Sequence, residues 1–176
     1  MKRNSFFLLT VAAFLSVAFA ALLAHAQDLG DTISAPGLFS YQEPKGWTAR
    51  DTTFSKYKIA FDAPKDNFSA NINVVVENFS GPLDKYVAAN KTNLKASTMF
   101  ENLQIVEEAP FTTTAGVTGV RLLITDTLGK ADLQQVFYIF AGTGDTKFVV
   151  TATSLPADGD RYAPIFDASM KTFSPK

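Results

Sequence analysis

The sequence predicts an α+β domain in which an antiparallel β-sheet of about six or seven strands is flanked by helices. Three observations support this class. Segments in which apolar and polar residues alternate recur along the chain, as expected for strands with one buried face. Two longer segments, one near the middle and one at the end, carry apolar residues at helical spacing. Short glycine-containing turns join the later strands, which favours antiparallel hairpins.

The first 26 residues predict a secretory signal peptide. A basic start precedes an uncharged apolar run over residues 6–24, and Ala24-His25-Ala26 places small residues at the two positions that a signal peptidase reads. We therefore expect cleavage after Ala26 and an exported protein, periplasmic or extracellular. The apolar run is also nearly long enough to span a bilayer, so an uncleaved anchor is the alternative.

Composition restricts the chemistry of the remaining 150 of the 176 residues. They contain no cysteine, and the single histidine of the chain, His25, lies within the predicted signal. The sequence therefore predicts no disulfide framework and no zinc site, and it lacks the usual general base and thiol nucleophile. No cofactor is expected. Without Lys2 and Arg3, the chain has 14 basic and 17 acidic residues and a net charge of −3. This charge argues against nucleic-acid binding.

The start of the exported chain predicts a leader followed by short strands. Residues 27–37 are polar and predict a flexible leader, whereas residues 38–176 are enough for a single domain with a real core. Residues 38–42 alternate and predict a strand, which the turn Pro44-Lys45-Gly46 ends. Trp47 then begins a second short strand, and residues 57–63 predict a third.

Residues 70–77 show the cleanest alternation in the first half of the chain. Ala70, Ile72, Val74 and Val76 share one face. Asn71, Asn73 and Glu77 point to the other. This pattern predicts a strand with one buried face.

Pro82 opens the first predicted helix, because proline is favoured in the first turn. Leu83, Tyr86, Val87 and Leu94 lie on one face at helical spacing, and the helix is expected to run to about residue 98.

The second half predicts a meander of strands and a closing helix. The expected strands cover residues 103–108, 117–125, 133–140 and 147–153, with turns at residues 126–129 and 141–145. The segment 133–140 ends apolar on both faces, as a central strand should. The final helix carries one apolar stripe, made of Tyr162, Ile165, Phe166, Ser169, Met170 and Phe173. Pro164 is expected in its first turn, because an interior proline removes a helical hydrogen bond.

The segment Phe39-Ser40-Tyr41-Gln42-Glu43-Pro44-Lys45-Gly46-Trp47 resembles the opening of PsbP-like domains, in which an aromatic strand leads into a Pro-x-Gly-Trp turn. The later order is also similar. The 70–77 strand precedes a helix near Pro82, and the Gly119-Val120-Arg121 strand precedes an aromatic helix that ends in Thr172-Phe173-Ser174-Pro175. The resemblance covers roughly residues 38–175 and implies an α/β/α sandwich around an antiparallel sheet.

The functions of this family are disparate, so the resemblance implies a fold and not an activity. Its photosynthetic members are extrinsic subunits that support the oxygen-evolving centre, and others are small binding or accessory proteins. The photosystem members depend on N-terminal segments beyond the common fold. Residues 27–37 hold no recognisable equivalent of those segments.

Few residues are candidates for catalysis or metal binding. Glu107 and Glu108 are the only adjacent acidic pair, but neighbours on a strand point to opposite faces and cannot flank one bond. Asp158-Gly159-Asp160 is the best candidate for calcium, although helix capping by Asp160 explains it more simply. Gly142-x-Gly144 lacks the third glycine and the following helix of a phosphate loop, so it predicts a hairpin turn.

Two residues are candidates for ligand contact. Trp47 could stack on a ligand, although a core position is the simpler expectation. Asn90, on the apolar face of the first helix, could bind a ligand between helix and sheet, although an edge position on the helix or pairing with the backbone is the simpler expectation. The glycosylation acceptor pattern occurs at Asn67, Asn78 and Asn90, and matters only if the source glycosylates its exported proteins.

We therefore expect an exported, non-catalytic accessory or binding protein of the cell envelope that acts through protein–protein contact. A small-molecule or lipid-binding protein with a site between helix and sheet is the alternative. An extrinsic photosystem II-type subunit and an enzyme restricted to Asp, Glu, Lys and Tyr are weaker hypotheses. The expected partner is an unknown envelope protein or a small ligand, with peripheral membrane contact at most. No catalytic, cofactor-binding or metal-binding residue is assigned.

Overall fold

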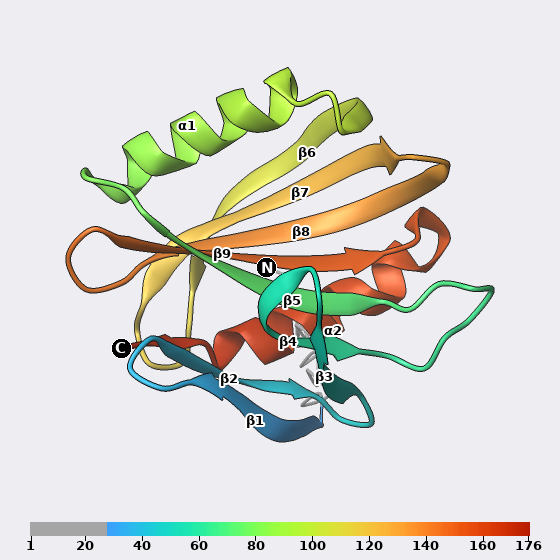
Figure 1. Ribbon diagram of the computed structural model, residues 1–176, viewed down its shortest axis with the longest axis horizontal. Helices are drawn as coiled ribbons and strands as arrows, with labels where there is room; N and C mark the ends of the chain where they lie inside the picture. The colour runs from blue at the N-terminus through green and yellow to red at the C-terminus, as the bar shows by residue number, and fades with distance from the viewer. Residues whose placement is uncertain (1–27) are drawn as a thin grey trace, which may run out of the picture.

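The computed structural model describes residues 28–176, so the predicted signal peptide lies outside the described residues. Seven strands form one antiparallel sheet, the central layer of the fold (Figure 1). In spatial order they are β3 (Thr48–Thr52), β4 (Ser55–Phe61), β5 (Asn71–Asn78), β9 (Thr146–Ser154), β8 (Ala131–Ala141), β7 (Thr118–Leu128) and β6 (Phe100–Thr112). The α+β class with a seven-stranded antiparallel sheet is confirmed, and β8 is central as its two apolar faces predict.

A second sheet of three strands lies below the first and corrects two expectations. It consists of β1 (Leu29–Ala35), β2 (Phe39–Pro44) and β10 (Ser174–Pro175). The expected flexible leader therefore contains an ordered strand, because Ile33 and Ala35 bury their side chains in the core when β1 pairs with β2. The strand predicted at residues 38–42 exists as β2, but it belongs to this small sheet and not to the main one.

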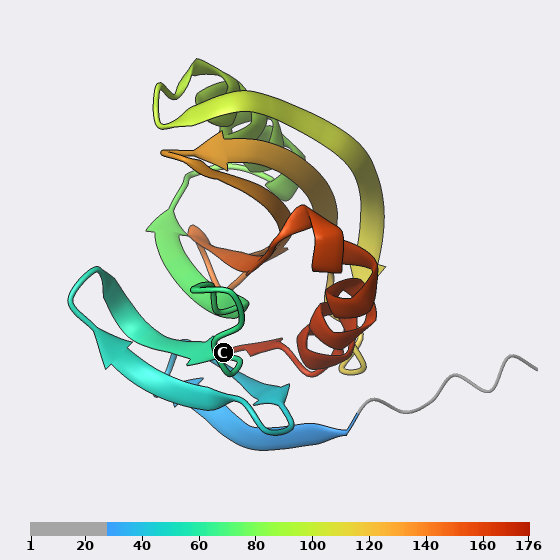
Figure 2. The same ribbon diagram turned by 90° about the vertical axis from the view of Figure 1, so that its right-hand side faces the viewer.

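Two helices cover opposite faces of the main sheet. Helix α1 (Leu83–Ala96) packs on one face, where Tyr86 and Val87 meet Leu122, Phe137 and Val149. Helix α2 (Gly159–Lys171) follows a short 3₁₀ turn and lies between the other face and the small sheet (Figure 2). The result is a layered α/β/α arrangement with one hydrophobic core on each side of the sheet.

The larger core is aromatic and joins the small sheet, α2 and the main sheet. Phe173, directly after α2, stacks on Phe140 at 4.8 Å between ring centroids and meets Phe39 and Phe148 at 5.8 and 5.5 Å. All four side chains are fully or almost fully buried. Because the chain has no cysteine, packing of this kind carries the stability of the domain.

The expected position of Pro164 was wrong, since α2 begins at Gly159 and the proline lies in its second turn. Proline lacks the backbone N–H that would otherwise donate a hydrogen bond to the carbonyl of Asp160. Asp160 and Pro164 are both exposed, so water can hydrogen-bond to that carbonyl. Gly159, at the start of this helix, is buried against the Gln134 side chain, where a Cβ atom would collide with the Gln134 amide.

The expected turn at residues 126–129 was also placed too early. Strand β7 continues to Leu128, and Gly129 and Lys130 alone form the connection to β8. Gly129 has a φ of +66°, a value that glycine adopts without strain. Asp126 continues the buried face of Leu122 and Ile124 and accepts a hydrogen bond from Gln135, a role that its polarity hides in the sequence.

Candidate functional site

A polar groove lies between α1 and the sheet, where the sequence placed a possible ligand site. It has a volume of about 380 Å³ and is lined by Glu77, Tyr86, Asn90 and Leu94, among others. The Tyr86 hydroxyl donates to Glu77 at 2.6 Å, and the Asn90 side-chain amide donates to the Tyr86 carbonyl at 3.3 Å. Burial, together with Glu77, raises the pKa of Tyr86, so its phenol stays protonated and cannot act as a base.

A charged cluster ties α2 to the opposite face of the sheet. Asp167 of α2 accepts hydrogen bonds from the buried Tyr138 hydroxyl of β8 and from Arg121 Nε of β7, the latter at 3.0 Å. Arg121 also lies 3.6 Å from Glu107 of β6. Burial opposes the charge on Arg121, but the Asp167 carboxylate outweighs it and raises the pKa of the guanidinium. The groups bind one another, which gives the cluster a structural role.

A third polar site lies in an open groove of about 470 Å³ between the small sheet and β3. Glu43 of β2 lines this groove beside Trp47, Asp31 and Lys58. Its side chain is buried, and Oε2 has no hydrogen-bond partner within residues 28–176. Burial, with a smaller contribution from Asp31, raises the pKa of Glu43.

We expect Glu43 and Asp126 to add to the free energy of unfolding as the pH is lowered from neutral towards their unfolded pKa values, which are about 4. Burial raises the pKa of both Glu43 and Asp126 in the folded protein, above unfolded values of about 4. The folded state therefore binds these protons more tightly. The resulting stabilisation is complete below the unfolded pKa and is lost as pH rises through the folded pKa. Urea denaturation at several pH values measures the effect.

The variant Glu43→Gln tests the assignment to this side chain. It is expected to be more stable than the wild type at pH 7, by about 1 kcal/mol, and to show a flatter pH dependence. Exposed Glu101 supplies the control Glu101→Gln. Equal pH profiles for both variants would rule out Glu43 as a source of the effect.

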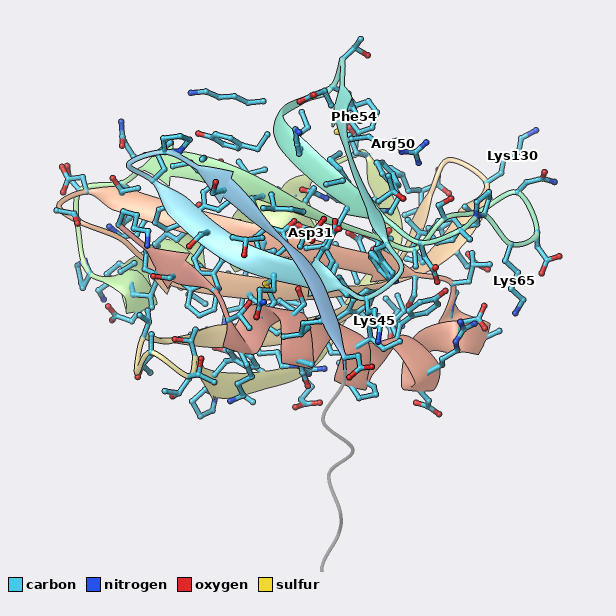
Figure 3. The ribbon with its side chains drawn as sticks, turned by 90° about the horizontal axis from the view of Figure 1, so that it is seen from below. Asp31, Lys45, Arg50, Phe54, Lys65 and Lys130 are labelled. Atoms are coloured by element: carbon cyan, nitrogen blue, oxygen red, sulfur yellow. The ribbon has the colours of Figure 1, made fainter. Side chains whose placement is uncertain are left out.

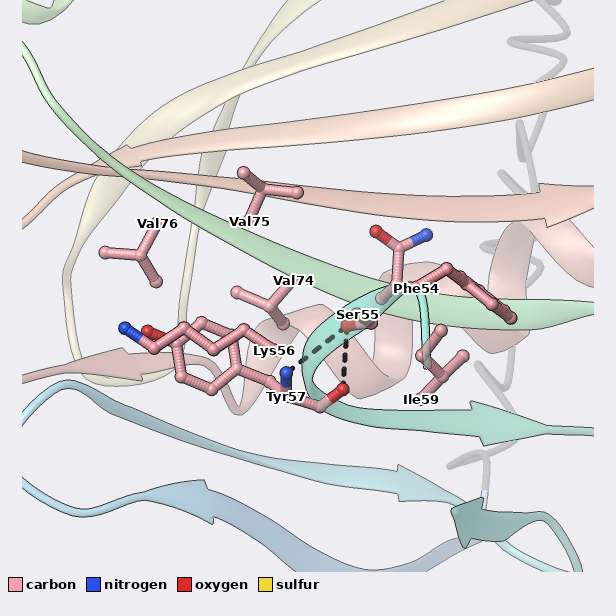
Figure 4. Close-up of a pocket in the computed structure, with 9 residues that line it drawn as sticks. Phe54, Ser55, Lys56, Tyr57, Ile59, Val74, Val75 and Val76 are labelled. Atoms are coloured by element: carbon pink, nitrogen blue, oxygen red, sulfur yellow. Dashed lines mark hydrogen bonds between the residues drawn. The ribbon is translucent and has the colours of Figure 1, made fainter. Parts of the chain in front are cut away.

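A fourth groove, of about 330 Å³, opens between β4 and β5 (Figure 4). One wall is formed by Ser55, Lys56, Tyr57 and Ile59 of β4, and the other by residues 73–76 of β5. Two apolar side chains at this groove are strongly exposed: Phe54 at 78% and Val75 at 45%. Figure 3 shows Phe54 at the surface, in the turn between β3 and β4. This groove is the most apolar of the exposed candidate sites described above.

The structure shows the surroundings of the residues that the sequence singled out for ligand contact. Trp47 is buried and packs edge-on against Tyr162 and Phe166, so the core interpretation is confirmed. Asn90 pairs with the backbone, which is one of the three interpretations given above, and it also lines the groove under α1. Among the acceptor asparagines, Asn67 and Asn78 are exposed and Asn90 is half-buried.

The acidic candidates are dispersed. Glu107 and Glu108 contact opposite faces of the sheet, as predicted, because Glu107 approaches Arg121 whereas Glu108 pairs with Lys91 of α1 at 2.6 Å. The residue that precedes α2 is Asp158, not the predicted cap Asp160, and its carboxylate pairs with Lys65 at 3.2 Å. Within residues 28–176, no group of three or more His, Cys, Asp or Glu side chains could hold a metal ion. Gly142-x-Gly144 forms the β8–β9 turn.

The groove between β4 and β5 was not predicted from the sequence. Nothing in the alternation of residues 57–63 or 70–77 shows that two consecutive strands separate over most of their length. The one available signal is the connection over residues 62–70, which is too long for a tight hairpin.

No protein-family model matches the chain, and no curated protein is detectably similar in sequence. Solved structures do match. The solution structure of cyanobacterial PsbP (CyanoP) from Synechocystis sp. PCC 6803 aligns with a TM-score of 0.60 at 11% identity, over 96% of this chain and 99% of CyanoP. The chain has a PsbP-like fold. The arrangement expected from the Pro-x-Gly-Trp turn and the element order is therefore confirmed.

Two further solved structures are similar to this PsbP-like fold. LpqN from Mycobacterium tuberculosis, which is involved in cell envelope biogenesis, aligns with a TM-score of 0.60 at 11% identity, over 83% of this chain and 90% of LpqN. PA94 from Pseudomonas aeruginosa, a protein of unknown function, aligns with a TM-score of 0.58 at 17% identity, over 85% of this chain and 99% of PA94. At these identities the likeness establishes the fold alone.

Proposed function

We propose that this PsbP-like protein is an exported, non-catalytic accessory protein of the cell envelope that acts through protein–protein contact. The observation that carries the proposal is the exposed apolar surface formed by Phe54 and Val75 at the groove between β4 and β5. A phenylalanine exposed at 78% beside a strand of valines is unfavourable in water and is typical of a surface that binds another protein.

Export is supported by the sequence of the first 26 residues, with their basic start, apolar run and Ala-His-Ala end. A structural neighbour involved in cell envelope biogenesis is compatible with the same location. The helices within residues 28–176 are too short or too polar to cross a membrane.

The non-catalytic part of the proposal is supported by the chemistry of two polar clusters. Histidine and cysteine are missing after residue 26. Tyr86 and Tyr138 both have pKa values raised first of all by burial, and each hydroxyl is bound to a carboxylate. These two hydroxyls hold elements together and are not activated as nucleophiles.

Site-directed photo-crosslinking in cells tests this function. A photo-reactive phenylalanine analogue replaces Phe54 in the tagged full-length protein, and crosslinked products are captured and identified by mass spectrometry. Met99 and Val106, exposed at 66% and 57% outside this surface, provide matched control positions. We expect one reproducible envelope protein crosslinked from position 54 and absent from positions 99 and 106.

Two other results would contradict the proposal. Equal crosslinking from all three positions would show unspecific contact. Capture of the chain alone would favour the alternative, a carrier of a small ligand in the groove lined by Tyr86 and Asn90. Native mass spectrometry of the purified protein would then reveal the mass of that ligand.

A further inference from the structure

One long edge of β5 is unpaired inside the main sheet. Strand β9 pairs with β5 along its whole length, from Asn71 to Asn78. On the other side, β4 pairs with β5 only at Ile72 and Asn71, and the two strands then diverge (Figure 2). Residues 73–76 of β5 therefore line an open groove, although they lie in the interior of the strand order.

The register identifies the backbone groups that face this groove. The Phe79 amide donates to the Asp145 carbonyl at 2.8 Å and continues the β5–β9 ladder, so odd-numbered residues of β5 direct their backbone groups to β9. The amides and carbonyls of Val74 and Val76 point to the opposite side, towards β4. Within the described residues, neither valine has a strand partner there.

The start of β4, beside the groove, is irregular. The Ser55 hydroxyl donates to the Tyr57 carbonyl at 2.8 Å and accepts from the Tyr57 amide at 3.3 Å, as Figure 4 shows. The pairing of β3 with β4 also shifts register between Arg50 and Thr52. A register shift of this kind bends a strand locally, and β4 stays paired with β5 only at Ala60 and Phe61.

We propose that the open edge of β5 receives an extended segment of a partner protein as an added strand. This inference rests on the proposed function and names the chemistry of its partner. Unpaired backbone donors and acceptors in a row specify an extended peptide, because only a strand presents matching groups at the same spacing. Natural proteins usually protect such edges with charges or proline, whereas here Val74, Val75 and Val76 follow one another.

Side chains around the groove specify the character of the added strand. Val75 is exposed at this groove and Val76 is half-buried, whereas Ile59 and Val74 are buried. The accessible valines favour apolar residues at alternate positions of the segment. Lys56 lines the same groove, with its ammonium 5.5 Å from the centre of the Tyr57 ring, and it pairs with no carboxylate of residues 28–176. An acidic residue in the segment would complement this charge. The expected length is roughly four to six residues, as for an ordinary short strand.

Amide hydrogen exchange and peptide selection test the proposal together. In the protein alone, the amides of Val74 and Val76 are expected to exchange faster than those of Asn73 and Val75, which face β9. A displayed library of random decapeptides is then selected on the purified protein. We expect selected peptides to alternate apolar residues, to contain Asp or Glu, and to slow exchange at Val74 and Val76.

Two variants test whether the selected peptides bind at the open edge of β5. Val76→Pro removes the amide that faces the groove and no hydrogen bond to β9, and is expected to weaken the selected peptides roughly tenfold. Because Val76→Pro could also disturb folding, Lys56→Glu is the second variant. It changes an exposed side chain and is expected to weaken acidic peptides while leaving the unfolding midpoint unchanged.

Several outcomes would overturn the inference. They are slow exchange at Val74 and Val76 in the protein alone, no enriched peptide, or peptides that bind both variants as well as the wild type. Dimerisation abolished by Val76→Pro would assign the edge to a second copy of the chain and also refute a partner protein. Crosslinking from position 54 that persists unchanged in Val76→Pro would leave the accessory function standing and refute strand addition alone.

Discussion

Replacement of Phe173 by alanine is expected to lower the free energy of unfolding by about 3–5 kcal/mol. The Phe173 side chain is fully buried and contacts Phe39 of the small sheet and Phe140 and Phe148 of the main sheet. Its removal leaves a cavity at the point where both sheets and the end of α2 meet. Single domains are typically stable by only about 5–15 kcal/mol, so this variant should be close to unfolding at 37 °C.

Phe54→Ala is the matched control, because it removes the same ring from a site exposed at 78%. It is expected to change stability by no more than about 0.5 kcal/mol. Urea denaturation followed by circular dichroism gives both values, provided that the dependence on denaturant is the same in the two variants. Similar midpoints for Phe173→Ala and Phe54→Ala would show that the aromatic core does not determine stability.

Replacement of Asp167 by alanine is expected to cost about 1–3 kcal/mol. It leaves the Tyr138 hydroxyl and the Arg121 guanidinium without their acceptor on α2, and both side chains are largely buried. Thermal unfolding should show a clear decrease in midpoint. Asp160→Ala, on the exposed side of the same helix, is the control and should have a much smaller effect.

A double-mutant cycle separates this pairing from a general loss of helix stability. Tyr138→Phe should be destabilising in the wild type and nearly neutral when Asp167 is already alanine, because the hydroxyl then has no carboxylate to bind. Additive effects of the two substitutions would mean that the Tyr138–Asp167 hydrogen bond contributes nothing to stability.

Elements whose burial follows from their own sequence could be predicted. The alternation over residues 70–77 corresponds to β5, and the stripe from Tyr162 to Phe173 marks the buried face of α2. In each case the apolar period reports the secondary structure directly, because one face packs on the core whatever the partner is. The interpretation of Trp47 as a core residue was confirmed for the same reason.

Features that depend on distant partners could not be predicted. Residues 29–35 include Gly30 and three polar side chains, and they form β1 only because β2 and the core beneath it are present. The groove between β4 and β5 depends on where two strands separate, which is a property of the backbone. Hydrophobic alternation specifies which side chains are buried, but it does not specify how far a pair of strands remains hydrogen-bonded.

The pairing of β10 with β2 constrains the order in which the domain can form. The backbone amide of Gln42 donates to the Thr172 hydroxyl across 130 positions of the chain, and Pro175 of β10 pairs with Phe39 of β2. A chain that emerges N-terminus first, from a ribosome or a translocation channel, presents β2 long before β10 and Phe173. The apolar side chains of the first strands therefore remain without their packing partners until almost the whole domain has emerged. Such dependence on contacts between distant residues is typical of slow-folding domains that need protection from aggregation during synthesis.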